Sequence, residues 1–114
     1  MKSSVAYLRY LNLTKSIEAT PAAPSLDLIE REVLSALALR WNKDQPILIA
    51  DAISLKEIAS QATLHGHLKQ LKKKGMVKIV LDSSDGRRKY IEPTQKTCNY
   101  FDQMAKCVIK AAKI

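Results

Sequence analysis

A segment that combines a helical repeat with dense positive charge constrains the fold of this 114-residue chain more than any other feature. Residues 61–74 predict a helix whose inner face carries leucines four and three residues apart, at Leu64, Leu68 and Leu71. Ser60 suits the N-cap of this helix, and Gly75 suits the left-handed residue that often ends one. The segment closes with three consecutive lysines, so the solvent-facing side of the helix is basic.

A strand–turn–strand pattern follows this helix directly. Residues 76–81 read as a strand with apolar side chains at alternate positions on one face, from Val77 to Leu81. Residues 82–86 are Asp-Ser-Ser-Asp-Gly, which is turn chemistry, and residues 87–92 return as a second strand that ends at a proline. A basic helix followed at once by a basic-tipped hairpin is the pattern of a winged helix, whose helix enters the DNA major groove while the hairpin reaches beside it.

The net charge of +8 is unevenly distributed along the chain. Residues 1–59 carry seven basic and seven acidic side chains, a net of zero. Residues 60–89 carry eight basic against two acidic, a net of +6, and residues 90–114 carry four against two, a net of +2. Such a concentration on one supersecondary unit favours a polyanionic partner, because neutralising phosphates releases condensed counterions. The alternative is a solvated surface with surplus lysine.

Helices are also predicted at both ends of the chain. Residues 3–17 are apolar around most of a helical circumference, which is typical of a helix buried against a partner subunit. Residues 18–24 contain two prolines and form a connector. Residues 95–113 predict a final helix that packs on the domain or on a second copy, with an apolar stripe of Cys98, Phe101, Met104, Ala105, Val108 and Ala112.

Between the connector and the basic helix, one long and one short element are predicted. A helix begins at Ser25 or Asp27 and runs to about Asn42, and its Asp27 and Glu30 have the spacing of a capping box. Residues 47–55 read as a short helix, although their first three residues are equally suited to a short strand. The predicted fold is therefore mainly α with a small β-hairpin wing (α+β).

This pattern predicts a winged helix-turn-helix with N- and C-terminal helices for dimerisation, the alternative being that these two helices cap their own monomer. The expected parts are a helix and linker over residues 1–24, a DNA-binding domain over residues 25–94, and a C-terminal helix over residues 95–114. A hydrophobic content of 46% is sufficient for a packed core.

The outward arc of the 61–74 helix supplies the residues expected to contact DNA. The first turns of a recognition helix approach base edges, and later positions meet the backbone. Gly66 lies in mid-helix on this arc, either because the helix backbone approaches the duplex there or because the glycine is merely tolerated. The base-edge candidates are Gln61, Thr63, His65 and Gln70, and the phosphate candidates are Ser60, Lys69, Lys72 and Lys73. The alternatives are that Ser60 is a helix cap only and that Gln61 and Thr63 are ordinary surface residues.

Arg87, Arg88 and Lys89 are the wing residues expected to contact DNA. An arginine at a hairpin tip can enter the minor groove and respond to its width and potential. Strand alternation places 87 and 89 on one face and 88 on the other, so the three cannot contact DNA alike. Asp85 is expected to order the turn and to pair with Arg87. A solvated turn is the alternative for this segment.

These motifs resemble those of winged-helix regulators of the multiple-antibiotic-resistance regulator (MarR) type over residues 26–97. The resemblance rests on Ser60-x-x-Thr63 with the three leucines, the KKKGMV segment at 72–77, Asp85-Gly86-Arg87-Arg88, and Tyr90-Ile91-x-Pro93-Thr94. It implies a winged-helix domain, homodimerisation through the terminal helices, and binding to pseudo-palindromic operators. Members of that family have longer helices around an effector pocket. The short arms here favour a compact relative without a small-molecule effector. Pro93 stands where the family often has leucine or valine before the threonine, which is a local departure from the motif.

The leading functional prediction is a sequence-specific, dimeric transcriptional regulator that binds double-stranded DNA. The alternatives are a winged-helix protein–protein interaction module in a larger assembly, and a non-specific architectural DNA binder. An enzyme is not expected, because there is no phosphate-binding glycine loop and no catalytic set of side chains. No cofactor and no metal are expected either.

A cytoplasmic location is expected, since the sequence contains no apolar run of membrane-spanning length and no secretion signal. Its two cysteines are spaced for neither a metal site nor a redox pair, and reduced thiols are expected. Cys98 is predicted to pack in the core, and Cys107, off the apolar stripe, to be exposed.

Overall fold

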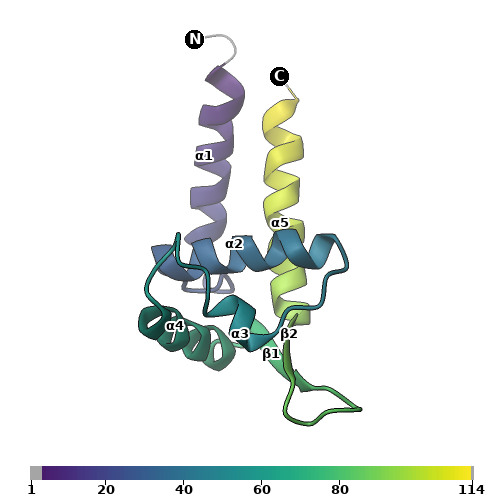
Figure 1. The fold of residues 1–114 in the computed structure, drawn as a ribbon. Helices are drawn as coiled ribbons and strands as arrows, with labels where there is room; N and C mark the ends of the chain where they lie inside the picture. The colour runs from purple at the N-terminus through teal and green to yellow at the C-terminus, as the bar shows by residue number, and fades with distance from the viewer. Residues whose placement is uncertain (1–3, 114) are drawn as a thin grey trace. The chain divides into compact units, whose positions relative to one another are not determined.

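The computed structural model describes residues 4–113 and contains five helices and one two-stranded sheet. The elements are α1 (Val5–Glu18), α2 (Leu28–Asn42), α3 (Ile49–Ala52), α4 (Gln61–Lys73), β1 (Val77–Leu81), β2 (Lys89–Pro93) and α5 (Gln95–Ala112), as Figure 1 shows. They divide into two compact units: the helical pair, residues 4–25 with 95–113, and the winged-helix unit, residues 26–94. The prediction of a mainly α fold with a small β-hairpin wing is confirmed.

The winged-helix unit is built on α2, whose start the sequence encodes. Asp27 Oδ1 accepts a hydrogen bond from the Glu30 amide at 2.8 Å, and Glu30 Oε1 accepts one from the Asp27 amide at 3.2 Å. This reciprocal pair is the predicted capping box. The core beneath α2 is apolar and includes Val33, Leu34, Leu37, Ile47, Leu64, Leu71, Met76 and Ile91. Trp41 donates from Nε1 to the Ile91 carbonyl at 3.1 Å, which ties the end of α2 to β2.

The end of α4 is a Schellman motif, as the glycine predicted. Gly75 has φ of 75°, donates to the Lys72 carbonyl, and is followed by Met76, which donates to the Leu71 carbonyl. The hydroxyl of Thr94, just after β2, donates to the Gly75 carbonyl. The two ends of the hairpin therefore meet at the C-terminus of α4, which fixes the wing relative to that helix.

The hairpin is antiparallel, with Ile79 opposite Ile91 and Val77 opposite Pro93. Its second strand begins at Lys89 rather than at the predicted residue 87, because the Arg88 amide donates to the Asp85 carbonyl and keeps the chain in the turn. Val77, Ile79 and Leu81 were predicted on one face of the strand, and along this face exposure increases from the buried Val77 to Leu81, which is 59% exposed. The segment before α3 combines both readings of residues 47–55, since Leu48 bridges to Tyr90 and a one-turn helix follows.

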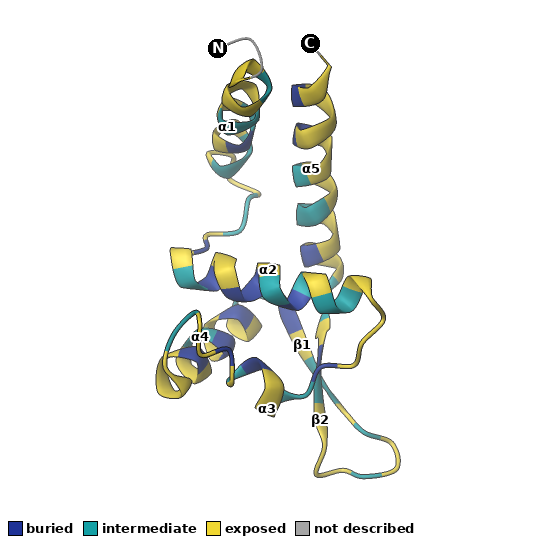
Figure 2. Ribbon diagram, turned by 45° about the horizontal axis from the view of Figure 1, so that its top comes forward, coloured by how far each residue is buried: buried dark blue, intermediate teal, exposed yellow. Residues whose placement is uncertain are grey.

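The helical pair consists of α1 and α5 side by side in opposite directions (Figures 1 and 2). Arg9 Nη1, near the start of α1, donates to the Lys113 carbonyl at the end of α5 at 2.9 Å. The two cysteine predictions were wrong, because Cys107 is buried and Cys98 is exposed. Of the stripe predicted on α5, Phe101 and Met104 are half-buried, whereas the other four residues are exposed. No helix of residues 4–113 is both long enough and apolar enough to cross a membrane.

Candidate nucleic-acid interface

Ser60 and Thr63 organise the first turn of α4. Ser60 Oγ accepts a hydrogen bond from the Thr63 amide at 3.3 Å and donates to the Thr63 hydroxyl at 2.9 Å. Ser60 is therefore an N-cap, as predicted, and caps of this kind stabilise a helix by about 1 kcal/mol. Both hydroxyls are at the surface, where they remain available to a ligand.

The two faces of α4 differ completely in chemistry. Leu64, Leu68 and Leu71 are buried. The exposed residues are Gln61, Ala62, Thr63, His65, Gly66, Lys69, Gln70, Lys72 and Lys73, which include every α4 residue predicted to contact DNA. The helix contains no acidic side chain, and its net charge comes from its lysines. This face offers neutral hydrogen-bonding groups in its first turns and cations toward its end.

Lys74, the last of the three consecutive lysines at 72–74, has a different environment. Its Nζ lies 2.7 and 2.8 Å from the two carboxylate oxygens of Glu30, whose side chain is only 2% exposed. Lys74 therefore neutralises a buried charge at the start of α2 instead of extending the basic face. Sequence reasoning missed this pair, although the capping box that buries Glu30 was recognisable.

His67, Asp27 and Glu30 lie together next to this ion pair. Their nearest ligand atoms are all within 4.8 Å of one another, and His67 Nδ1 is 3.4 Å from Asp27 Oδ2. The backbone amide of Glu30, above all, lowers the pKa of Asp27, and His67 and Lys74 lower it further. Because the Lys74 ammonium already occupies the Glu30 carboxylate, this cluster is a polar network that joins α2 to α4.

The wing is ordered by Asp82. Its Oδ1 accepts hydrogen bonds from the Ser84 amide at 2.9 Å, the Ser84 hydroxyl at 2.8 Å and the Asp85 amide at 3.3 Å. Its Oδ2 accepts one from the Tyr90 hydroxyl at 3.2 Å. These donors, the Ser84 amide first, lower the pKa of Asp82. Sequence reasoning treated this residue only as part of the turn, and the signal that could have identified it is its Asp-Ser-Ser start, which is typical of an Asx turn.

Asp85 holds the backbone of the wing at Arg87, as predicted. Asp85 Oδ1 accepts from the Arg87 amide at 3.0 Å and from Arg87 Nε at 3.3 Å. The Arg87 side chain is still 94% exposed, and Arg88 and Lys89 are exposed as well. The tip of the hairpin thus presents three cations on a backbone that two aspartates order.

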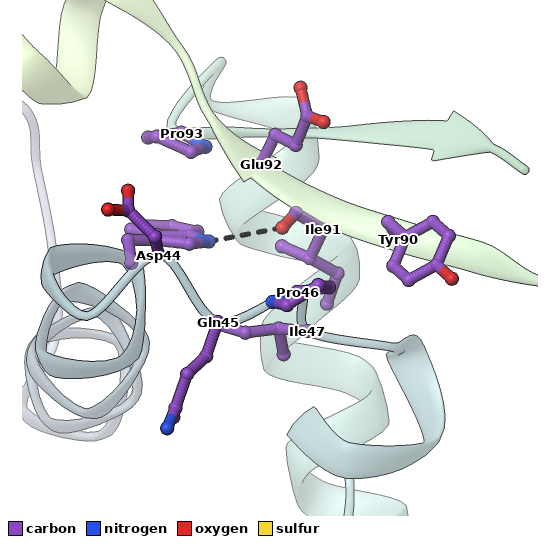
Figure 3. A pocket seen from close by; sticks show the side chains of 9 residues that line it. Asp44, Gln45, Pro46, Ile47, Tyr90, Ile91, Glu92 and Pro93 are labelled. Carbon is purple, nitrogen blue, oxygen red and sulfur yellow. Dashed lines mark hydrogen bonds between the residues drawn. The ribbon is translucent and has the colours of Figure 1, made fainter.

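In the winged-helix unit, α4 and the wing lie on the same side, and α2 lies on the other (Figures 1 and 2). A single extended ligand can therefore contact both. The hollow between the end of α2 and β2 is a separate feature, and Figure 3 shows its lining side chains. It is flanked by the carboxylates of Asp44 and Glu92 and contains none of the predicted DNA contacts, so it does not suit a polyanion.

Comparison with known proteins gives matches in structure only. No family model matches the sequence, and no curated protein matches it. The transcriptional regulator Tm0710 from Thermotoga maritima is 15% identical with a TM-score of 0.61, over 92% of this chain and 66% of that one. MepR of S. aureus, bound to ethidium bromide, is 16% identical with a TM-score of 0.61, over 95% of this chain and 77% of that one.

A third solved structure contains DNA. Reduced AbfR bound to DNA is 19% identical with a TM-score of 0.55, over 95% of this chain and 71% of that one. The chain spans about two thirds of the length of Tm0710. At identities this low, the structural similarity establishes the fold alone, and that fold agrees with the motifs of residues 60–94. The chain has the winged-helix fold of the MarR-type transcriptional regulators.

Proposed function

We propose that this protein is a sequence-specific transcriptional regulator that binds double-stranded DNA as a dimer. The observation that carries the proposal is that α4 and the wing lie on the same side of α2, and that the lysines, arginines and neutral hydrogen-bonding residues predicted to contact DNA on them are all exposed. Phosphate contacts supply affinity and position, whereas contacts to base edges supply specificity. The DNA-bound structure of AbfR, which shares the fold, supports this reading.

The residues of α4 are proposed to divide by their position along the helix. Gln61, Thr63, His65 and Gln70 are proposed to contact base edges, since glutamine in particular can pair with adenine in the major groove. Ser60, Lys69, Lys72 and Lys73 are proposed to contact phosphates, and Gly66 to allow close approach of the duplex. On the wing, Arg87, Arg88 and Lys89 are proposed to contact the adjacent minor groove or backbone.

Dimerisation is proposed to use an apolar flank of the helical pair. On α1 this flank includes Tyr7 and Leu8, which are 62% and 41% exposed, and on α5 it includes Val108, which is 55% exposed. Helical periodicity places Leu11, Phe101 and Ala105 on the same flank. A second copy covering this flank would give a dimer with two α4 helices, the number that an operator of two half-sites about one helical turn apart requires.

The test is a fluorescence-anisotropy titration with the DNA upstream of the protein's own gene, against a scrambled duplex, at physiological salt. The proposal expects a preference of about a thousandfold for the specific duplex. His65→Ala and Gln70→Ala are expected to change the sequence preference. Lys73→Ala is expected to weaken binding to both duplexes alike and to reduce the salt slope by about one.

Equal losses on both duplexes for all three variants would refute the assignment of base-contacting residues. If the wild-type protein binds the upstream duplex and its scrambled form equally, and selection from a random duplex library yields no preferred site, the protein is an architectural binder. No binding to any duplex would contradict the proposal and would favour a protein-docking role for the basic face.

A further inference from the structure

A second basic surface lies in the helical pair, in the groove between α1 and α5. One end of this groove is lined by Arg9, Lys110 and Lys113 around Leu13. The next stretch is lined by Lys106 and Ile17, and shares Leu13 and Lys110 with the first. The two hollows adjoin at these shared residues along one side of the helical pair, and we call them together the α1/α5 groove.

The α1/α5 groove has an apolar floor and cationic rims. Leu13 and Ile17 are half-buried and Cys107 is buried, so the floor is formed by packed apolar side chains. Arg9, Lys106, Lys110 and Lys113 are exposed, and no lining residue within residues 4–113 is acidic. Arg9 Nη1 is held at the groove by its hydrogen bond to the Lys113 carbonyl.

None of these four cations pairs with a carboxylate in the described part of the chain. The only acidic residues of the helical pair are Glu18 and Asp102, and neither lines the groove. A concave surface with one sign of charge and an apolar floor is complementary to an amphipathic anion.

A second copy of the chain is a poor occupant for this groove. Helical periodicity puts Arg9 and Lys110 on the side of the helical pair opposite to Leu11 and Phe101, so the groove and the proposed dimer flank are different surfaces. A second groove facing the first would bring together eight like charges. The surface is therefore open to another partner in the dimer as well as in the monomer.

We propose that the α1/α5 groove binds an acidic amphipathic helix of a partner protein. The groove runs along α1 from Arg9 to Ile17, roughly 12 Å at the rise of an α-helix, which accommodates about two helical turns, and it continues past the end of α1 to Thr20. A third helix laid between two antiparallel helices buries its apolar stripe on their floor and presents its flanks to both rims. Apolar residues at i, i+3 or i+4 and i+7 would contact Leu13 and Ile17, and flanking Glu or Asp side chains would meet the cations.

The experiment uses the full chain and a fluorescein-labelled peptide of four helical turns, with leucines at i, i+4, i+7 and i+11 and glutamates on both flanks. Anisotropy is expected to show saturable binding that weakens as salt is raised. Lys106→Glu/Lys110→Glu is expected to weaken binding by about tenfold or more, because like charges then face each other. Two matched variants, Lys15→Glu on α1 outside the groove and Lys73→Glu on α4, are expected to change the affinity for the peptide by less than about twofold.

Two comparison peptides complete the test, one with glutamine in place of glutamate and one with the leucines scrambled. Both are expected to bind at least about tenfold more weakly. The proposal is overturned if the acidic peptide does not bind, or if Lys73→Glu weakens binding as much as the groove variant does. Equal binding of the glutamine peptide overturns it too. So does a result in which the protein prefers anionic phosphatidylglycerol vesicles to the peptide, and the groove variant abolishes binding to the vesicles but not to the peptide. Circular dichroism and DNA titration of the groove variant show whether it is folded and keep this outcome separate from that of the proposed function.

Discussion

The buried carboxylate of Glu30 connects the start of α2 to the end of α4. It accepts hydrogen bonds from Lys74 and from the Asp27 amide, and it has almost no contact with water. Removing a partner from a buried charge costs more than the pair itself contributes, since the remaining charge is left unsolvated. At the scale of single residues, the contact between Lys74 and Glu30 is therefore sensitive to the loss of either partner.

Lys74→Ala is accordingly expected to lower the free energy of unfolding by about 3 kcal/mol. Lys73→Ala, one residue earlier and exposed, is expected to change it by less than about 0.5 kcal/mol. Urea denaturation followed by circular dichroism measures both. Similar stabilities for the two variants would show that the Glu30 carboxylate is solvated or protonated in the folded protein.

Gly66 provides a residue-scale test of how closely α4 approaches DNA. A Cβ atom added there meets no atom within 4 Å, so alanine fits without strain. Gly66→Ala is expected to stabilise the protein by about 0.5–1 kcal/mol, because alanine favours the helix, and to weaken DNA binding if the duplex backbone passes over this position. Thermal denaturation and anisotropy measure the two effects separately. A stabilised variant with unchanged affinity would mean that the glycine has no role in binding.

At the scale of elements, the wing depends on a network centred on one carboxylate. Asp82 accepts hydrogen bonds from three groups of the turn and from Tyr90 on β2. Asp82→Ala is expected to disorder the tip and weaken DNA binding severalfold, while global stability changes by less than about 1 kcal/mol, since the turn is outside the core. Ser83→Ala in the same exposed turn is the matched control. Equal affinities for the two variants would contradict a positioning role for Asp82.

The elements also show how far local pattern reaches. The start of α2, both ends of α4 and the hairpin were predictable, because capping boxes, Schellman glycines and strand–turn–strand patterns act through neighbours in sequence. The orientation of α5 about its own axis was not predictable from the sequence. Its apolar residues span a wide arc, and the position of α1 decides that Cys107 is buried while Cys98 and Val108 are exposed.

At the scale of the whole molecule, that orientation leaves exposed the apolar flank that we propose binds a second copy. Val108→Asp is expected to raise the dimer dissociation constant by about tenfold or more, because dimerisation would bury an unpaired charge. Ser16→Asp, on the groove side of α1, is the control and is expected to leave the dimer intact. Sedimentation equilibrium measures both. A wild-type protein that sediments as a monomer at all accessible concentrations would contradict the proposed dimer.

The sequence by itself determined the order of the elements, the type of all of them except the segment at residues 47–55, the caps of α2 and α4, and the concentration of positive charge between residues 60 and 89. These features follow from interactions within a few residues of one another. The tertiary structure alone decided that Lys74 pairs with Glu30, that Asp82 organises the wing, and that the cations of α1 and α5 line one groove. Those outcomes depend on which segments meet in space, because the energy of a buried charge or a shared groove belongs to pairs of residues that are far apart in sequence.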